Sequence, residues 1–311
     1  MSVLIPPFLK QGDTVLLIAT ARARSKETVE PAITILEGWG LKVVPGPHVF
    51  KVHHQFAGTD KQRASDLQWA INHPSARAVI FTGGGYGTMR VIDAVNFKFL
   101  KKIPKWFVGY SDATAVHSRL HKLGVASVHG TMAFQFTKNA EATESLRHLL
   151  FGMPQEYVCE KHRLNRPGDA SAPVVGGNLS LLYALSGSVD DIDTRGKILF
   201  IEDLDEQLYH IDRMMLQLKR SGKLSHLKGM IVGGMSDMKD NAVPYGKNAE
   251  EIIFDAVKEY AYPVCFNFPA GHIERNLALY LGAKAQLAVT KKGAYFQPSV
   301  NVSGKKNKAG L

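Results

Sequence analysis

Short apolar runs alternate with helical patterns through the first half of the chain, and this alternation limits the fold more than any other feature. Residues 13–19 read Asp-Thr-Val-Leu-Leu-Ile-Ala, a β-branched and apolar run typical of a strand buried on both faces. Helical spacing follows over 25–39 and again over 59–72, where Thr59 and Asp60 are predicted caps. Repeated strand–helix–strand units predict an α/β domain with a doubly wound parallel sheet and ligands at the carboxyl ends of its strands.

The second half of the chain shows a similar pattern. Strands are predicted at 198–201, 228–232 and 264–268, and helices at 208–222 and 247–260. Residues 277–289 alternate between apolar and polar and break at Gly282, which predicts a pair of short strands. We therefore expect a smaller C-terminal α/β domain with a partly closed sheet.

Periodicity fades between these two patterns, from about residue 152 to residue 173. Pro154, Pro167 and Pro173 fall in this interval, and proline interrupts regular structure. A chain of 311 residues with 45% hydrophobic content is large enough for two ordinary cores. The predicted organisation is an N-terminal α/β domain over 1–153, a linker over 154–173 and a C-terminal domain over 174–311.

Composition argues against several classes of protein. No run approaches the ~18 apolar residues of a membrane span, and residues 1–11 lack the pattern of a secretory leader. We therefore expect a cytoplasmic protein without membrane association. Cys159 and Cys265 are the only cysteines and lie too far apart in sequence for a metal knuckle. The expectation is no metal site, no cofactor and two buried thiols.

The chain carries a net charge of +10, so a nucleic-acid partner has to be considered. Part of the excess lies near the end of the chain, at Lys291, Lys292, Lys305, Lys306 and Lys308. A charge run of this kind is typical of a solvated tail, and no basic helix with interleaved aromatic residues accompanies it. We expect no nucleic-acid partner.

A serine stands on a predicted strand-to-helix turn at residues 107–114. Gly109-Tyr110-Ser111-Asp112 follows an apolar strand, and a helical pattern runs on to Leu123. A serine at such a turn holds its hydroxyl in solvent near the helix start, where developing negative charge is stabilised. Ser111 is therefore a candidate nucleophile. The alternative is that Ser111 or Asp112 caps the helix, and we expect Asp112 to do so in either case.

A glycine-rich stretch, Thr82-Gly83-Gly84-Gly85-Tyr86-Gly87-Thr88, follows the preceding strand at the same predicted edge of the sheet. Glycines let the backbone approach a ligand closely and leave amides free to donate hydrogen bonds. The stretch lacks the Gly-Lys-Ser/Thr of a P-loop, and Thr88 stands where dinucleotide binding requires a third glycine. Beside Ser111, this loop is expected to form an oxyanion hole, with a plain turn as the alternative.

Three further side chains with acid or base chemistry stand at predicted strand ends. Glu202 ends an apolar strand, where a carboxylate needs a partner, and His272 follows another strand in Pro269-Ala270-Gly271-His272. A serine nucleophile needs a base, and the base needs a group that holds its tautomer, so Ser111, His272 and Glu202 have the three roles available. His129 ends a third strand and is a weaker candidate for a base.

The ordered motifs resemble those of the LD-carboxypeptidases (muramoyltetrapeptide carboxypeptidases) over nearly the whole chain. The matching segments of the first half are Gly12-Asp13, Arg63-x-x-Asp66-Leu67, Gly84-Gly85-Tyr86-Gly87 with Arg90, Gly109-Tyr110-Ser111-Asp112-x-Thr114, and His129-Gly130. Those of the second half are Gly176-Gly177-Asn178-Leu179, Glu202-Asp203-x-Asp205-Glu206-x-x-Tyr209-x-x-Asp212-Arg213, and Pro269-x-Gly271-His272. The long segment that begins at Glu202 is the most specific.

The resemblance implies a metal-free serine peptidase that removes the terminal D-alanine from murein tetrapeptides at the L-to-D bond. It implies Ser111 as the nucleophile, His272 as the base and then the acid, and Glu202 as the carboxylate that orients His272. The amide of Asp112, with that of Gly84 or Gly85, would form the oxyanion hole. The family also suggests a small peptide as substrate, a homodimer, and a role in cell-wall recycling in the bacterial cytoplasm.

The chain departs from the family pattern at three places beside the expected pocket. Gly83 stands where many members have arginine, Thr20-Ala21 replaces a Pro-Ser-like pair, and Thr131 replaces a proline. These departures leave the substrate less constrained than the mechanism.

A carboxypeptidase must also bind a free terminal carboxylate, with a cation or with backbone amides. Arg90 and Arg213 are the candidates for this role, with structural ion pairs as the alternative for either arginine. Tyr86 and His129 are further predicted substrate contacts.

Two other functions remain open at this point. Relatives of the family include microcin-immunity peptidases, which cleave peptide–nucleotide antibiotics. An aromatic-bearing loop over the site would favour that function, and residues 160–173 contain no Trp. The second alternative is a non-enzymatic protein that binds an anionic ligand or nucleic acid, for which Ser111→Ala would have no effect.

Overall fold

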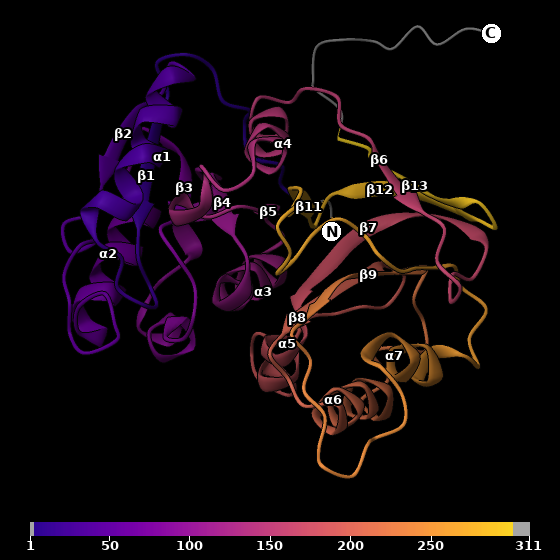
Figure 1. The fold of residues 1–311 in the computed structure, drawn as a ribbon. Helices are drawn as coiled ribbons and strands as arrows, with labels where there is room; N and C mark the ends of the chain where they lie inside the picture. Colours follow the sequence, from indigo (N-terminus) through magenta and orange to yellow (C-terminus); the bar gives the residue numbers. More distant parts are fainter. Residues whose placement is uncertain (1–2, 301–311) are drawn as a thin grey trace, which may run out of the picture.

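Two mixed sheets organise the chain, one in each half (Figure 1). The structure is a computed structural model and describes residues 3–300. The predicted tail lysines at 305, 306 and 308 therefore lie outside the described residues. None of the helices within 3–300 has the length and apolar composition needed to cross a membrane.

Five strands of the first half and one of the second, β11 (Leu279–Leu281), form a six-stranded sheet of order β11-β5-β4-β3-β1-β2. Its elements are β1 (Thr14–Ile18), α1 (Lys26–Gly38), β2 (Lys42–Pro45), α2 (Asp60–Asn72), β3 (Ala76–Phe81), η1 (Thr88–Arg90), η2 (Ile92–Ala94), η3 (Lys98–Lys101), β4 (Trp106–Gly109), η4 (Ser111–Ala113), α3 (Thr114–Leu123), β5 (Ser127–His129), η5 (Ala133–Gln135) and α4 (Ala140–Leu150). Strands β1 to β5 are parallel to their neighbours, and β11 is antiparallel to β5. The predicted doubly wound sheet is confirmed.

Strand β1 explains why its sequence is apolar throughout. Val15 and Leu17 pack in a core with residues of α1 and α4, whereas Leu16 and Ile18 pack in a second core with residues of α2 and α3. Successive side chains of a strand point to opposite faces, so a strand covered by helices on both sides needs apolar residues at every position.

The second half forms a seven-stranded sheet of order β10-β9-β8-β7-β12-β13-β6. Its elements are β6 (Tyr157–Glu160), β7 (Gly168–Asn178), α5 (Leu179–Leu185), β8 (Ile198–Leu204), α6 (Leu208–Arg220), β9 (Gly229–Ser236), α7 (Ala249–Val257), β10 (Val264–Cys265), β12 (Lys284–Thr290) and β13 (Gly293–Pro298), while β11 (Leu279–Leu281) joins the first sheet. Strands β10, β9, β8 and β7 are parallel, and β12, β13 and β6 continue the sheet antiparallel.

This second sheet curls without closing. Helices α5, α6 and α7 cover one face, where Leu179, Ile211 and Ile253 share a core. On the other face, Cys159 of edge strand β6 and Cys265 of edge strand β10 belong to the same core cluster. No ladder joins these two edges in the part of the chain that the structure describes, so the sheet is open and is not a barrel.

Several predicted boundaries differ from the structure. The interval predicted as a linker contains β6 and the start of β7, both paired within the second sheet. Residues 277–289 break at Gly282 as predicted, but β11 pairs with β5 of the first sheet and only β12 belongs to the second. Of the predicted strand 264–268, only Val264–Cys265 forms a strand.

Candidate active site

Three loops meet at the carboxyl edge of the six-stranded sheet. The order β2-β1-β3-β4-β5 makes β1 and β3 neighbours, so the chain leaves their carboxyl ends toward opposite faces and opens a crevice. Residues 19–25 follow β1, residues 82–88 follow β3, and Ser111 follows β4. The amide of Arg22 donates to the carbonyl of Gly84 at 3.3 Å, which joins the first two loops.

Ser111 begins η4 in a left-handed backbone conformation, with a φ of 60°. This conformation is unfavourable for a residue with a side chain, and strain of this kind clusters at functional sites. No side chain caps η4 or α3; the carboxylate of Asp112 instead accepts the amide of Thr88 at 2.7 Å. The predicted capping role is therefore wrong, and Asp112 ties the glycine-rich loop to the serine turn.

Gly84 lets the glycine-rich loop approach the serine. A Cβ atom on Gly84 would lie 3.1 Å from Cβ and 3.3 Å from Oγ of Ser111, so a side chain there would crowd the hydroxyl. Within residues 3–300, the amides of Gly84 and Gly85 donate to no backbone carbonyl. Asp112 lies in the first turn of a helix, where amides have no intrahelical acceptor. Amide donors therefore flank the hydroxyl.

Glu202 and His272 come together from two strands of the second sheet. Glu202 lies in β8, and His272 follows β10. Nδ1 of His272 lies 2.6 Å from Oε2 of Glu202, and the backbone amide of His272 donates to the same oxygen at 3.1 Å. Gly271 makes this approach possible, because its φ is 108° and a Cβ atom there would lie 2.6 Å from Cβ of Glu202.

Glu202 and His272 each stabilise the charged form of the other. Burial acts to raise the pKa of Glu202, but the adjacent His272 and His129 outweigh it and hold the pKa at about 2. Burial acts to lower the pKa of His272, but the charge of Glu202 outweighs it and raises that pKa above its ordinary value. With a proton on Nδ1 facing the carboxylate, Nε2 of His272 is left for a group in the cleft.

His129 lies behind this pair. Its side chain has no exposed surface, and Nε2 stands 3.8 Å from Oε1 of Glu202, too far for a hydrogen bond. Neither ring nitrogen of His129 nor Oε1 of Glu202 has a hydrogen-bond partner in the described part of the chain. In this structure His129 can act on Glu202 but cannot touch a ligand in the cleft, which departs from its predicted role as a substrate contact.

A cleft of about 510 Å³ brings Ser111 and His272 together, with Gly84 and Gly85 in its lining. A second hollow of about 380 Å³ also has His272 in its wall. The polar contacts of the His272 ring and amide within residues 3–300 are with Glu202, and none joins Nε2 to the Ser111 hydroxyl. The two side chains therefore face one cleft and would need to draw together for proton transfer, as catalytic groups often do when substrate binds.

The two sheets are joined beside the serine. The amide of Asn178, at the end of β7, donates to Oγ1 of Thr114 in α3 at 3.0 Å. Asn178 also donates through Nδ2 to Oδ1 of Asp203 at 2.8 Å. Burial raises the pKa of Asp203 to about 7, and the charge of Glu202 adds to the effect. One asparagine therefore links the serine helix to the strand that carries Glu202.

The comparisons with known proteins bear on this geometry. The family model described as the LD-carboxypeptidase N-terminal domain matches residues 15–130, and the model described as the LD-carboxypeptidase C-terminal domain matches residues 171–287. The chain belongs to the LD-carboxypeptidase family. It is a serine-type carboxypeptidase and hence a hydrolase.

Three relatives of this LD-carboxypeptidase illustrate the match. A probable murein peptide carboxypeptidase of Bacillus subtilis is 35% identical, covering 95% of each chain. The murein tetrapeptide carboxypeptidase of Pseudomonas aeruginosa is 27% identical, covering 88% of this chain and 92% of its own. The crystal structure of a muramoyltetrapeptide carboxypeptidase from Oxalobacter formigenes superposes with a TM-score of 0.84 at 27% identity, covering 92% of this chain and 98% of its own.

The microcin C7 self-immunity protein MccF, in complex with aspartyl sulfamoyl adenosine, superposes with a TM-score of 0.82 at 21% identity, covering 94% of this chain and 98% of its own. At that level of identity the likeness concerns the fold.

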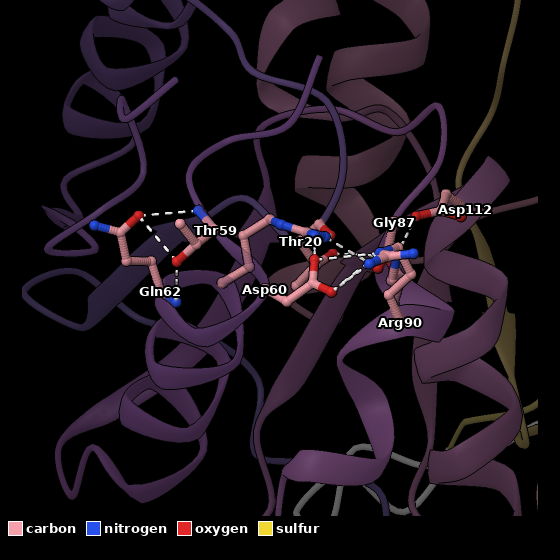
Figure 2. A network of polar contacts seen from close by, with 9 residues as sticks. Thr20, Thr59, Asp60, Gln62, Gly87, Arg90 and Asp112 are labelled. Carbon is pink, nitrogen blue, oxygen red and sulfur yellow. Dashed lines mark hydrogen bonds and ion pairs between the residues drawn. The ribbon is translucent and has the colours of Figure 1, made fainter. Parts of the chain in front are cut away.

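Besides His129, three residues predicted to contact substrate in this LD-carboxypeptidase are not in the lining of the serine cleft. Nη2 of Arg90 donates to Asp60 at 2.7 Å (Figure 2). The guanidinium of Arg213 lies over the ring of Tyr209, with 5.3 Å from Cζ to the ring centroid. Tyr86 is 50% exposed. For Arg90, the structure favours the structural ion pair that was the alternative.

The ion pair of Arg90 belongs to a polar network that includes Gly87, at the end of the glycine-rich loop (Figure 2). Buried Arg63 contacts Asp60 and donates to the carbonyls of Thr20 and, at 3.0 Å, Gly87. These bonds hold the start of the loop after β1 against the end of the loop after β3.

Other lining residues of the cleft were not predicted. Arg22, Arg24 and Asp203 face the same space as Ser111. The signal for the arginines was their position directly after β1, because loops after the two strands at a topological switch line the crevice. No group of three or more His, Cys, Asp or Glu side chains within residues 3–300 could hold a metal ion.

Proposed function

We propose that this LD-carboxypeptidase removes the terminal D-alanine of murein tetrapeptides through an acyl-enzyme on Ser111, with His272 as general base and acid and Glu202 as its orienting carboxylate. The observation that carries the proposal is the 2.6 Å contact between Nδ1 of His272 and Oε2 of Glu202, at a cleft that His272 shares with Ser111. The murein tetrapeptide carboxypeptidase of P. aeruginosa supports the substrate class.

Acylation begins when Oγ of Ser111 attacks the carbonyl carbon before the terminal residue and Nε2 of His272 takes the hydroxyl proton. The negative charge then moves to the carbonyl oxygen. Amides of Gly84 or Gly85 and of Asp112 donate to that oxyanion, and each such donor typically contributes about 3–4 kcal/mol of transition-state stabilisation. The carbon–nitrogen bond breaks as His272 returns the proton to the leaving amine, which departs as free D-alanine.

Deacylation reverses these roles. His272 takes a proton from water, the hydroxide oxygen attacks the ester carbon, and the intermediate collapses with the proton passing to Oγ of Ser111. Glu202 remains ionised throughout, consistent with its pKa of about 2, and stabilises the imidazolium that forms in each half-reaction.

The family relationship also supports a setting for this reaction. We place it in cell-wall recycling in the cytoplasm and expect the active protein to be a homodimer. Size-exclusion chromatography with light scattering measures the assembly directly, and a monomer at working concentration would contradict the dimer.

Free D-alanine is the product that tests the proposal. The protein is incubated with a murein tetrapeptide, and D-alanine is quantified by mass spectrometry for the wild type, Ser111→Ala and Ser118→Ala. Ser118 is a matched control, because it lies on the following helix α3 and its buried hydroxyl has no partner within the described residues. The proposal predicts at least a 10³-fold loss for Ser111→Ala and near wild-type release for Ser118→Ala.

Undiminished release by Ser111→Ala would contradict the nucleophile assignment. A peptide–nucleotide conjugate forms a second arm of the assay. Cleavage of the conjugate without release of D-alanine from the tetrapeptide would favour the microcin-immunity alternative.

A further inference from the structure

We propose that Arg24, with Arg22 beside it, binds the terminal carboxylate of the peptide substrate. This inference rests on the proposed function, because it names the group that selects a free peptide end at the same cleft. The two arginines follow β1 at the topological switch and line the cleft together with Ser111.

The three consecutive glycines make room for three different side chains. A Cβ atom on Gly83 would lie 2.6 Å from Nε of Arg24, and one on Gly85 would lie 2.6 Å from Cδ of Arg22. Between them, a Cβ atom on Gly84 would lie 3.1 Å from Cβ of Ser111. The bare backbone of this loop therefore lets both arginine side chains lie across it, on either side of the glycine that faces the nucleophile.

Arg24 is held in place but lacks a partner for its charge. Its guanidinium carbon lies 4.1 Å from the centroid of the Phe134 ring, which fixes the plane of the group. Its Nε is buried and has no hydrogen-bond partner in the described part of the chain. A buried donor without an acceptor is costly, and a planar guanidinium matches a carboxylate through two parallel hydrogen bonds.

The acidic side chains of the same cleft are engaged elsewhere. Asp203 accepts from Asn178, Asp205 pairs with Lys239 at 2.5 Å, and Glu206 contacts His210 at 2.6 Å. Within residues 3–300, no ion pair includes Arg22 or Arg24. The positive charge of the loop after β1 therefore faces the cleft without compensation.

The neighbouring charge of Arg22 also disfavours the charge of Arg24. Burial lowers the pKa of Arg24, and the charge of Arg22 lowers it further. An anion placed between the two guanidinium groups would relieve both effects. The free carboxylate of a peptide end is an anion that a carboxypeptidase must hold close to the scissile bond, whereas a peptide that continues past this point would leave both charges uncompensated.

A pair of substrates that differ only in charge tests the assignment. One tetrapeptide ends in D-alanine with a free carboxylate, and the other ends in D-alaninamide. The wild type should cleave the acid with a kcat/KM roughly 10- to 100-fold above that of the amide. Arg24→Ala should lose most of that preference, through a raised KM for the acid and little change for the amide. Arg24→Lys should restore part of it.

Lys26→Ala is the control, because Lys26 is an exposed cation two residues along the chain that is not in the cleft lining. It should leave both kcat/KM values unchanged. Equal losses on acid and amide in Arg24→Ala would overturn the assignment, and so would a wild type that does not distinguish the two peptides.

Binding separates this inference from the proposed reaction. In the Ser111→Ala background, calorimetry should show tighter binding of the acid than of the amide, and adding Arg24→Ala should abolish the difference. If the wild type releases neither D-alanine nor D-alaninamide but this difference in binding persists, the proposed reaction is wrong and the carboxylate site is retained. If turnover proceeds while Arg24→Ala leaves the acid-to-amide ratio unchanged in both assays, the site is wrong.

Discussion

Glu202 is a fully buried carboxylate that stays charged because its partners are arranged around it. Oε2 accepts from both the ring and the backbone amide of His272, while His129 stands near Oε1. Removing a carboxylate from water normally favours its neutral form, so these neighbours are what keep the group ionised. The same charge raises the pKa of His272, which sets the pH range in which that ring can act as a base.

Glu202→Gln removes this charge with little change in shape. A base must be neutral to accept a proton, so kcat/KM should rise with pH through the pKa of His272, with a wild-type midpoint above the ordinary value of a histidine. In the variant, burial is no longer opposed by the carboxylate, and the midpoint should move to lower pH. The rate should also fall by about 10²- to 10⁴-fold, because the ring loses its orienting charge.

Glu144→Gln serves as the control for the pH profile, since Glu144 also contacts a histidine, His148, at 3.1 Å, but outside the cleft. Its profile should match that of the wild type. An unchanged midpoint in Glu202→Gln would contradict the electrostatic coupling.

Among the elements, β8 shows why some boundaries escape prediction. The apolar run ends at Ile201, yet the strand continues through Glu202 and Asp203 to Leu204. Burying a carboxylate in a core is normally unfavourable, but here His272 and Asn178 supply buried hydrogen-bond partners. Those partners come from distant parts of the chain, so local pattern predicts the strand but cannot predict how far it runs.

The Thr59 cap of α2, by contrast, depends on local sequence and was predictable. Thr59 and Gln62 form the two reciprocal bonds of a capping box at the start of α2. Helix α4 has a comparable signal, since Asn139 accepts the amide of Ala142, but it was not among the predicted helices. The triad candidates were found because each stands at or near the end of a predicted strand, whereas Arg24 lies in a loop whose path depends on glycines about sixty residues away.

The turn before His272 gives a test at the scale of one element. Gly271→Ala places a side chain at a φ of 108° and against Cβ of Glu202, so it should lower kcat strongly as well as the free energy of unfolding. Gly246→Ala meets nothing within 4 Å at a φ of 87° and should cost only the strain of the left-handed backbone, about 1–2 kcal/mol. Urea unfolding and the D-alanine assay measure both quantities. Equal kcat values for the two variants would show that Gly271 has no role in placing His272.

On the scale of the whole molecule, the active site depends on how the two sheets are joined. Ser111 follows β4 of the first sheet, and His272 lies between β10 of the second sheet and β11, which passes from the second half of the chain into the first sheet (Figure 1). An alternating segment predicts a strand but not the sheet it joins, because the two edges offer the same backbone groups. The sequence predicts two domains with separate cores. It does not predict that a strand from the second half of the chain joins the sheet of the first half.

Thr114→Val tests the joint between the sheets. It removes the acceptor of the Asn178 amide at little change in volume, and an unpaired buried amide should lower the free energy of unfolding by about 1–3 kcal/mol. Because this bond lies between Ser111 and Glu202, kcat should fall by roughly tenfold. Thr143→Val is the control: its hydroxyl donates to the Phe136 carbonyl at 2.8 Å within the first half, so it should lower stability but keep kcat. A wild-type kcat in Thr114→Val would show that the hydrogen bond between Asn178 and Thr114 does not position the active site.

The acyl-enzyme itself is the most direct test of the central claim. The protein is mixed with the murein tetrapeptide, quenched in acid within the first turnover, and analysed by intact-mass and peptide-mapping mass spectrometry. The account predicts an added mass equal to the tetrapeptide less D-alanine, attached to the peptide that contains Ser111 and absent from Ser111→Ala. Release of D-alanine with the adduct on another residue would contradict it.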